Sequence, residues 1–181
     1  LKAHFQACWP SADPCSAQAA EIMPVALRQF RNSVVLAIMA RDLSRQATFD
    51  ETLNSITGLA ELTIDSAYQC AMTAAIAQHG IPRDASGVPQ DMMIVGMGKL
   101  GGRELNVSSD VDYIFVYPEE GETTGRDDGS GKIDNYDFFT RLGKRLIASL
   151  NDITADGQVF RVDMRLRPNG DSGPLVCSSD M

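Results

Sequence analysis

The 181 residues suffice for one large domain or two small ones, and a hydrophobic content of 44% is ordinary for a protein with a full core. A formal net charge of −8 argues against a protein that binds nucleic acid nonspecifically. Because the sequence has no apolar run of transmembrane length and does not begin with a signal peptide, we also expect no membrane partner.

Residues 1–15 predict an irregular entry segment, because Pro10 and Pro14 interrupt any regular pattern. Two of the four cysteines lie in this segment, and the four together show no paired spacing. This usage favours reduced thiols in a cytoplasmic protein. Since the chain begins with leucine and its last motif lies close to the carboxy terminus, we expect a fragment of a longer protein.

Residues 24–46 have the spacing of a helix. Apolar side chains recur there at intervals of three and four residues: Leu27, Phe30, Val34 and Ile38. The other positions carry four arginines, which we interpret as a solvated face: Arg28, Arg31, Arg41 and Arg45.

A second helix is predicted to begin at Thr48, which forms a capping box with Glu51. A stripe of apolar and small residues runs behind this cap, and Gly80 with Pro82 supplies the stop signal. Two helices joined by a short turn should pack as an antiparallel hairpin. We therefore divide the chain into a helical segment, 1–83, and a second part, 84–181, with the loop 81–90 at the boundary.

The second part opens with an apolar run of strand length, 92–95, and a glycine-rich turn around Lys99. A second apolar run ends at Tyr117, and it opens with Asp110 and Asp112. Residues i and i+2 of a strand point to the same face, so these two carboxylates should lie side by side. Close carboxylates repel unless a cation or a proton lies between them, and oxygen ligands suit Mg²⁺. The glycines allow backbone N–H groups to approach phosphate oxygens. The stretch therefore predicts a metal-dependent site for a nucleotide or a phosphate.

Two better-known glycine motifs fit this stretch poorly. Residues 96–101 match the dinucleotide-binding pattern G-x-G-x-x-G, but the residues between Gly101 and Asp110 are too few and too poor in helix formers for a crossover helix. A phosphate-binding P-loop fails because Leu100, rather than Ser or Thr, follows Lys99.

Residues 118–134 predict a long acidic loop, for which mobility alone is the favoured interpretation over a function. Asp134 can cap a helix that extends to Ile153 and covers the sheet with an apolar stripe. Residues 159–166 alternate as a half-buried strand, and loops follow it. One face of this strand is charged: Arg161, Asp163, Arg165 and Arg167. A solvent-exposed edge and a site that holds a metal with an anion explain these charges equally well.

Three elements together resemble the nucleotidyltransferases of the DNA polymerase β superfamily. They are Leu100-Gly101-Gly102, Asp110-x-Asp112, and the third acidic residue in Val162-Asp163-Met164. The resemblance implies an α+β fold in which a small mixed sheet is flanked by helices, here after a helical hairpin. An acidic strand end and a glycine turn without a catalytic role remain the alternative.

The exact amino-acid sequence of two segments is more specific than this three-part pattern. Residues 96–112, Gly-Met-Gly-Lys-Leu-Gly-Gly-Arg-Glu-Leu-Asn-Val-Ser-Ser-Asp-Val-Asp, and 161–175, Arg-Val-Asp-Met-Arg-Leu-Arg-Pro-Asn-Gly-Asp-Ser-Gly-Pro-Leu, closely resemble the bifunctional glutamine synthetase adenylyltransferase/adenylyl-removing family. Residues 104–110 and 118–123 resemble the amino-terminal copy of its two catalytic domains more. That copy removes AMP from a tyrosine of glutamine synthetase by phosphorolysis, whereas the other copy attaches AMP from ATP. The resemblance implies glutamine synthetase, ATP or ADP, and phosphate as partners, with control by a PII-type signal protein and glutamine.

We expect Asp110, Asp112 and Asp163 to be the catalytic residues and the ligands of Mg²⁺ or Mn²⁺. A second group is expected to bind nucleotide or phosphate: Gly101, Gly102, Lys99, Arg103, Ser109, Arg161 and Arg165. Among its cations Arg165 is the best candidate, because it shares the predicted face of Asp163. The alternatives are adenylyl transfer from ATP to the tyrosine, a non-catalytic nucleotide-binding regulatory domain, and a dinucleotide-binding domain.

Overall fold

The computed structural model describes residues 1, 5 and 17–179, so most of the predicted entry segment lies outside the described residues. The helices are α2 (Ala17–Leu43), α3 (Phe49–His79), α4 (Gly98–Gly101), α5 (Asn135–Asn151) and the 3-10 helix η1 (Gly170–Ser172). The strands are β1 (Pro82–Asp84), β2 (Met93–Met97), β3 (Val111–Tyr117), β4 (Gly121–Thr123), β5 (Val162–Asp163) and β6 (Val176–Ser178).

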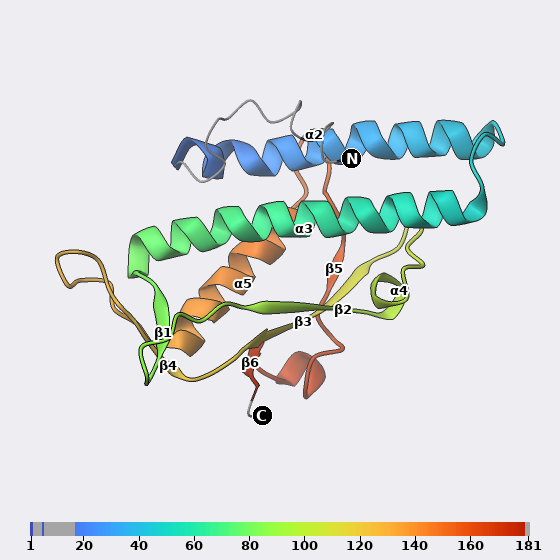
Figure 1. Ribbon diagram of the computed structural model, residues 1–181. Coiled ribbons are helices and arrows are strands. Elements are labelled where there is room, and N and C mark those ends of the chain that lie inside the picture. Colours follow the sequence, from blue (N-terminus) through green and yellow to red (C-terminus); the bar gives the residue numbers. More distant parts are fainter. Residues whose placement is uncertain (2–4, 6–16, 180–181) are drawn as a thin grey trace.

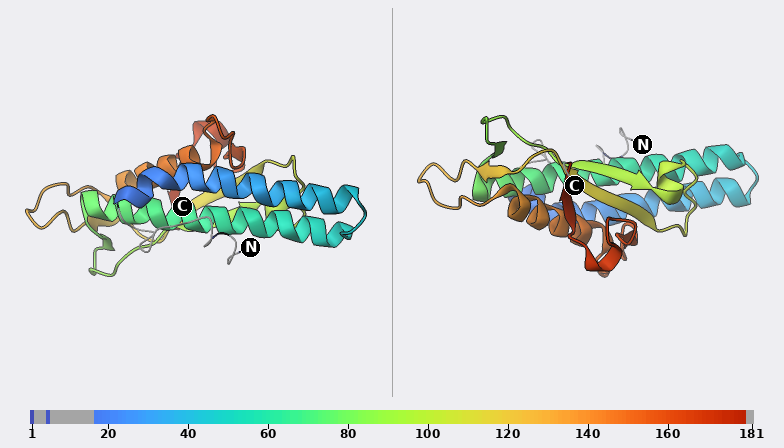
Figure 2. Two further views of the ribbon diagram at one scale, coloured as in Figure 1. Left: turned by 90° about the horizontal axis from the view of Figure 1, so that it is seen from above. Right: turned by 90° about the horizontal axis from the view of Figure 1, so that it is seen from below.

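Helices α2 and α3 form the predicted antiparallel hairpin, which lies along one side of the sheet, and α5 packs on α3 and reaches the sheet (Figure 1). The opposite side of β2 and β3 is open: seen from below, no helix among the residues drawn as ribbon crosses these strands (Figure 2). This mixed α+β arrangement agrees with the polymerase β-like nucleotidyltransferase fold that the sequence predicted. None of the helices in the described part of the chain is both long and apolar enough to span a membrane.

The predicted start of α3 is confirmed. The Thr48 hydroxyl accepts a hydrogen bond of 3.2 Å from the Glu51 N–H, as an N-cap should. The Glu51 carboxylate does not return to the cap, because it forms an ion pair of 2.7 Å with Arg41 on α2. Helix α2 begins at Ala17 rather than at residue 24. Its alanine-rich first turns favour a helix, which continues through Pro24.

The interpretation of Arg28 as a solvated residue is wrong. Its side chain is 1% exposed, and its guanidinium donates hydrogen bonds to the carbonyl oxygens of Ser149, Asp152 and Gly157. Burial lowers the pKa of Arg28, and the carboxylates of Asp152 and Asp156 oppose that shift. Because these carbonyls lie at and beyond the carboxy-terminal end of α5, Arg28 ties the hairpin to that helix end.

Strand β3 is the centre of the sheet. It pairs antiparallel with β2 on one edge and parallel with both β5 and β6 on the other. Its side chains alternate between buried and partly buried, and the buried set faces the helices. Tyr117, for example, stacks on Phe139 of α5 with ring centroids 5.2 Å apart. A single hydrophobic cluster joins the hairpin, α5 and this face, so the core is continuous across the predicted boundary at 83/84.

The predicted strand 159–166 is mostly wrong, because only Val162 and Asp163 form β5. The N–H groups of Val159 and Phe160 donate to the Leu150 carbonyl at the end of α5, at 2.9 and 3.1 Å, instead of to a strand. The alternation also fails at its end, where Leu166 is half exposed. Ile153, which was predicted to continue the apolar stripe of α5, is 79% exposed because the helix ends at Asn151.

Three short strands were not predicted. β1 and β4 pair antiparallel, with Arg83 opposite Glu122, and together they form a small second sheet within segments expected to be loops. β6 lies in the segment expected to be a terminal loop and adds a parallel partner to β3. Each is three residues long and pairs with a segment distant in sequence, so none carries a local periodic signal.

Candidate active site

Asp112 and Asp163 lie side by side on the open face of the sheet. They are direct partners in the parallel pairing of β3 with β5, and paired residues of neighbouring strands point to the same face. Asp110 precedes β3 by one residue. Both Asp110 and Asp163 raise the pKa of Asp112, so each of them lies within electrostatic reach of Asp112. The two separate stretches of sequence therefore meet at Asp112, where Asp163 is its strand partner.

The pKa of Asp112 is raised above its ordinary value. Burial is the largest cause, followed by the negative charges of Asp163 and Asp110. The positive charges of Arg165 and Lys99 oppose the shift. Asp112 is thus the carboxylate that the negative charges of Asp163 and Asp110 repel, and a cation placed beside it would relieve this repulsion.

Arg165 forms hydrogen bonds with the Asp163 carboxylate from the solvent-exposed side. Its Nε donates to Asp163 Oδ2 at 2.8 Å and its Nη2 to the same oxygen at 2.5 Å, while its backbone N–H donates to Oδ1 at 2.8 Å. These hydrogen bonds lower the pKa of Asp163. The Arg165 side chain is 72% exposed, whereas that of Asp163 is 16% exposed. The guanidinium can therefore turn toward an incoming anion without disturbing the core.

Arg161 has the same relation to Asp110. Its Nε donates to Asp110 Oδ1 at 2.5 Å, and its Nη2 donates to the Ser108 carbonyl oxygen at 2.9 Å. The pairing joins the segment before β5 to the segment before β3. Arg161 is thus paired with Asp110, and Arg165 is paired with Asp163. Asp112, the third carboxylate, lies between these two pairs. Arg161 and Asp163 thus lie against the Asp-x-Asp motif.

The glycine turn approaches Asp112 closely, and much of it is the short helix α4. Gly98 has φ of +52°, and a Cβ built there would lie 2.7 Å from Asp112 Oδ2. A Cβ on Gly101 would lie 2.6 Å from the Gly96 carbonyl oxygen. Gly101 therefore requires glycine for packing against the backbone, whereas at Gly98 the positive φ is the main reason for glycine. Gly102 follows as the residue that ends α4, and Lys99 is exposed and close enough to affect the pKa of Asp112.

Two of the predicted phosphate-binding residues are engaged elsewhere. Arg103, whose φ is +58°, turns toward α3 and forms an ion pair of 2.5 Å with Glu61. The Ser109 hydroxyl accepts a hydrogen bond of 3.2 Å from the Asn106 N–H within the turn that precedes β3. Sequence reasoning missed Glu61, because it lies on a helix without chemical motifs and its partner is 42 residues away. It also missed the close contact of Gly98 with Asp112, for which the glycine itself, directly before Lys99, was the available signal.

The chemistry of these donors, rather than their present arrangement, suits a divalent cation. Three carboxylates offer the hard oxygen ligands that Mg²⁺ and Mn²⁺ prefer, and the raised pKa of Asp112 marks the negative charge that such an ion would neutralise. Among residues 1, 5 and 17–179, no three acidic, His or Cys side chains are arranged as a metal-ligand group. Arginines engage the carboxylates of Asp110 and Asp163. Rotation of these exposed side chains would release Asp110 from Arg161 and leave the backbone N–H of Arg165 on Asp163.

Comparison with known proteins gives a consistent family. The model of the family described as glutamate-ammonia ligase adenylyltransferase matches residues 10–181. The chain is 56% identical over 171 residues to a bifunctional glutamine synthetase adenylyltransferase/adenylyl-removing enzyme of Chromobacterium violaceum, covering 94% of this chain and 18% of the relative. Enzymes with the same name from Ralstonia nicotianae and Bordetella pertussis are 49% and 46% identical over 100% and 99% of this chain. In those two the match covers 18% and 19% of the relative, so the chain spans less than a fifth of the length of these proteins.

Proposed function

The chain belongs to the glutamate-ammonia ligase adenylyltransferase family, and from this premise we propose that it removes AMP from an adenylylated tyrosine of glutamine synthetase by phosphorolysis. The products would be ADP and unmodified glutamine synthetase. The observation that supports the proposal is the position of Asp112 at one end of β3, paired with Asp163, where the charges of Asp163 and Asp110 raise its pKa. The names of the relatives include both attachment and removal of adenylyl groups.

The three carboxylates would hold Mg²⁺ or Mn²⁺. Such an ion, when bound, would supply positive charge to the oxygens of the phosphodiester. The chain's own cations would position the attacking phosphate: Lys99 from the glycine turn, with Arg161 and Arg165 from the segment around β5. Inorganic phosphate is already anionic at neutral pH, so it needs orientation and charge cancellation more than a general base. Arg103 would join this group only after leaving Glu61.

The reaction balances without a further reactant. A phosphate oxygen forms a bond to the phosphorus of the adenylyl group, and the bond from that phosphorus to the tyrosine oxygen breaks. The tyrosine oxygen leaves as a phenolate, a tolerable leaving group because the pKa of tyrosine is about 10, and then takes a proton from water. Asp163 would act in this direction as a ligand rather than as a base.

We prefer removal of AMP to its attachment because the sequences of residues 104–110 and 118–123 resemble the amino-terminal, adenylyl-removing copy of the family's two domains more than the other copy. Adenylyl transfer from ATP to the same tyrosine remains the second candidate, since the same carboxylates would serve both reactions. A regulatory domain that only binds nucleotide is the third candidate, but it would have no need of all three aspartates. Control by a PII-type signal protein and a cytoplasmic location are further proposals from the same family likeness.

The direction can be tested with two parallel incubations. In one, the chain receives adenylylated glutamine synthetase with inorganic phosphate, and ADP release is measured. In the other, it receives unmodified glutamine synthetase with ATP, and AMP incorporation is measured. We expect activity only in the first, with loss of activity in excess chelator and recovery with added Mg²⁺. AMP incorporation without ADP release would contradict the proposed direction, and full activity in chelator would contradict the metal site.

The same pair of assays should be run on a full-length relative in which this segment replaces its own counterpart. This arm separates an inactive site from a site that needs the rest of the longer protein. A chimera that releases no ADP, although the unmodified relative does, would reject the proposal for this chain.

A further inference from the structure

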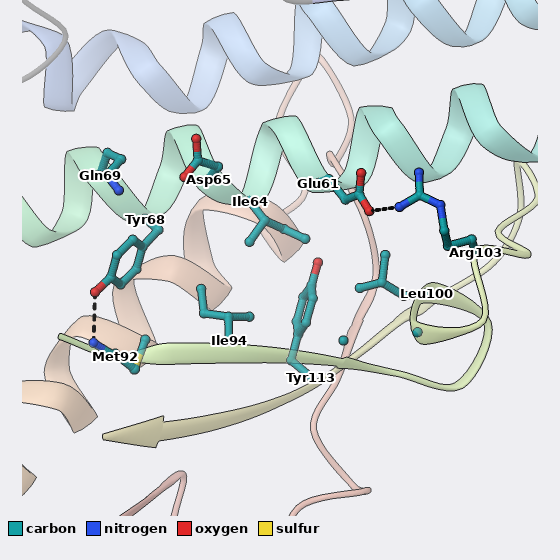
Figure 3. Close-up of a pocket in the computed structure, with 12 residues that line it drawn as sticks. Glu61, Ile64, Asp65, Tyr68, Gln69, Met92, Ile94, Leu100, Arg103 and Tyr113 are labelled. Carbon is teal, nitrogen blue, oxygen red and sulfur yellow. Dashed lines mark hydrogen bonds and ion pairs between the residues drawn. The ribbon is translucent and has the colours of Figure 1, made fainter. Parts of the chain in front are cut away.

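A groove lies on the helix-covered side of the sheet, opposite the carboxylates. It runs between α3, β2 and α4 and has a volume of about 560 Å³, within the range of roughly 300–1,000 Å³ typical of small-molecule sites. Figure 3 shows Ile64 and Glu61 extending from α3, Tyr113 rising from β3, and Leu100 projecting from α4. The proposed reaction uses none of these side chains.

The hydroxyl of Tyr113 is the unusual group in this groove. Tyr113 is 1% exposed, and its hydroxyl has no hydrogen-bond partner in the part of the chain that the structure describes. Buried polar groups are almost always hydrogen-bonded, and a tyrosine that only filled space could be a phenylalanine. Tyr68, the other tyrosine of the groove, is engaged: its hydroxyl accepts from the Met92 N–H at 3.1 Å and donates to Asp91. The Tyr113 hydroxyl thus points toward α3 with its hydrogen-bonding capacity unused (Figure 3).

The charges around the groove have an acidic excess. Among the groove-lining residues Glu61 and Asp65 are acidic, and Arg103 is the only basic one. The ion pair of Arg103 with Glu61 balances one acid, so Asp65 is left without an opposing charge in the groove. Ile64, Ile94 and Leu100 provide apolar contact.

We propose that this groove binds a small primary amine with a short aliphatic body, with its ammonium group between the acidic residues of α3 and the Tyr113 hydroxyl. The oxygen of a tyrosine hydroxyl has lone pairs that accept N–H donors, and the carboxylates supply the opposite charge. The aliphatic body would lie on Ile64, Ile94 and Leu100.

The groove lies next to the two elements that position the Asp112 carboxylate. Tyr113 directly follows Asp112 on β3, and Gly96 and Leu100 at the end of the groove belong to the glycine turn that packs on Asp112. A bound amine would therefore contact both elements that position Asp112, although binding itself does not depend on the proposed reaction.

The test measures the binding of butylamine to the chain through shifts of the chain's amide NMR signals. Two matched compounds of similar size serve as controls: butanol, which lacks the charge, and butyrate, which reverses it. We expect saturable shifts with butylamine at the amides of α3, β2 and α4, and no saturation with butyrate. Equal binding of all three compounds, or no saturable binding of butylamine, would overturn the proposal.

Two variants sharpen this result. Tyr113→Phe removes only the hydroxyl, and we expect about 3- to 10-fold weaker butylamine binding, the usual effect of one lost hydrogen bond. Asp65→Asn should weaken binding by a similar factor, whereas Asp127→Asn, on the distant loop between β4 and α5, should leave binding unchanged. Thermal unfolding of each variant verifies the fold. If Tyr113→Phe binds butylamine as well as the original chain does, the hydroxyl is only an unsatisfied core group and the site is rejected.

Discussion

The two faces of β3 differ in burial and in charge. On the face toward the helices, the side chains of Val111, Tyr113, Phe115 and Tyr117 are at most 1% exposed. On the other face, Asp112, Ile114 and Val116 are only partly buried, and Asp112 shares its surroundings with two further carboxylates and two arginines. The alternation of a strand thus separates residues that hold the fold from residues that are available for chemistry. A substitution on one face should change stability, and one on the other should change turnover.

Asp112→Asn tests the open face and should have the largest effect. We expect ADP release from adenylylated glutamine synthetase to fall by at least about 100-fold, because the central oxygen ligand is lost. The free energy of unfolding should be unchanged or higher, since the substitution removes repulsion by Asp110 and Asp163. Asp127→Asn is the control and should leave both quantities unchanged. Undiminished turnover in Asp112→Asn would break the assignment of chemistry to this face.

Phe115→Ala tests the covered face. Phe115 is fully buried, and it packs so closely on Gly143 of α5 that a Cβ there would lie 3.0 Å from its ring. We expect a loss of about 3–5 kcal/mol in the free energy of unfolding, measured by denaturant titration. Its neighbour on the other face, Val116, provides the matched control, and Val116→Ala should cost about 1 kcal/mol. Similar losses in both variants would show that the two faces do not differ as described.

Arg28→Met extends the test to the attachment of the hairpin. The substitution keeps an apolar stem of similar length but leaves carbonyl oxygens of Ser149, Asp152 and Gly157 without their donor. We expect a loss of about 2–4 kcal/mol in the free energy of unfolding. Arg45→Met, at an exposed position in the turn between α2 and α3, should change it by less than about 0.5 kcal/mol. If the Arg28 variant is as stable as the Arg45 variant, the buried guanidinium is not what joins α2 to α5.

The smallest effect is on the pH dependence of stability. Because the folded-state pKa of Asp112 is raised, the folded state binds its proton more tightly than the unfolded state does. Relative to Asp112→Asn, the original chain should lose stability as pH rises from the ordinary aspartate pKa of about 3.9 through the raised value. Asp163 has the opposite sign, since its pKa is lowered: its contribution is present at higher pH and is lost as pH falls through the lowered value.

Carboxyl NMR titration measures both groups directly. The midpoint of Asp112 should lie above that of Asp163, and Asp163→Asn should lower the Asp112 midpoint by removing a like charge. Arg165→Gln should raise the Asp163 midpoint, because the hydrogen bonds from Arg165 are the largest cause of its shift. An Asp112 midpoint that does not move in Asp163→Asn would show that the two carboxylates are not neighbours.

Long periodic elements were predictable, because their signals are local. The spacing of Leu27, Phe30 and Val34 predicted α2, and Thr48 marked the start of α3 by a cap that the structure retains. The run from Val111 to Tyr117 predicted β3 with its two faces. Short elements failed for the opposite reason, since β1, β4 and β6 form by pairing with distant segments. Residues 159–166 alternated in sequence, but the end of α5 captured the first N–H groups of that segment.

Residue types and their spacing along the chain were enough to predict the family, the hairpin, the central strand and the three candidate aspartates. The partner of each cation became visible only in the folded chain: Arg165 pairs with Asp163, Arg161 with Asp110, and Arg103 with Glu61 away from the carboxylates. Folding also buried Arg28 and left the Tyr113 hydroxyl without a partner among the described residues. The physical reason is that charge pairing and burial depend on distances between segments that fold together, and no local spacing encodes those distances.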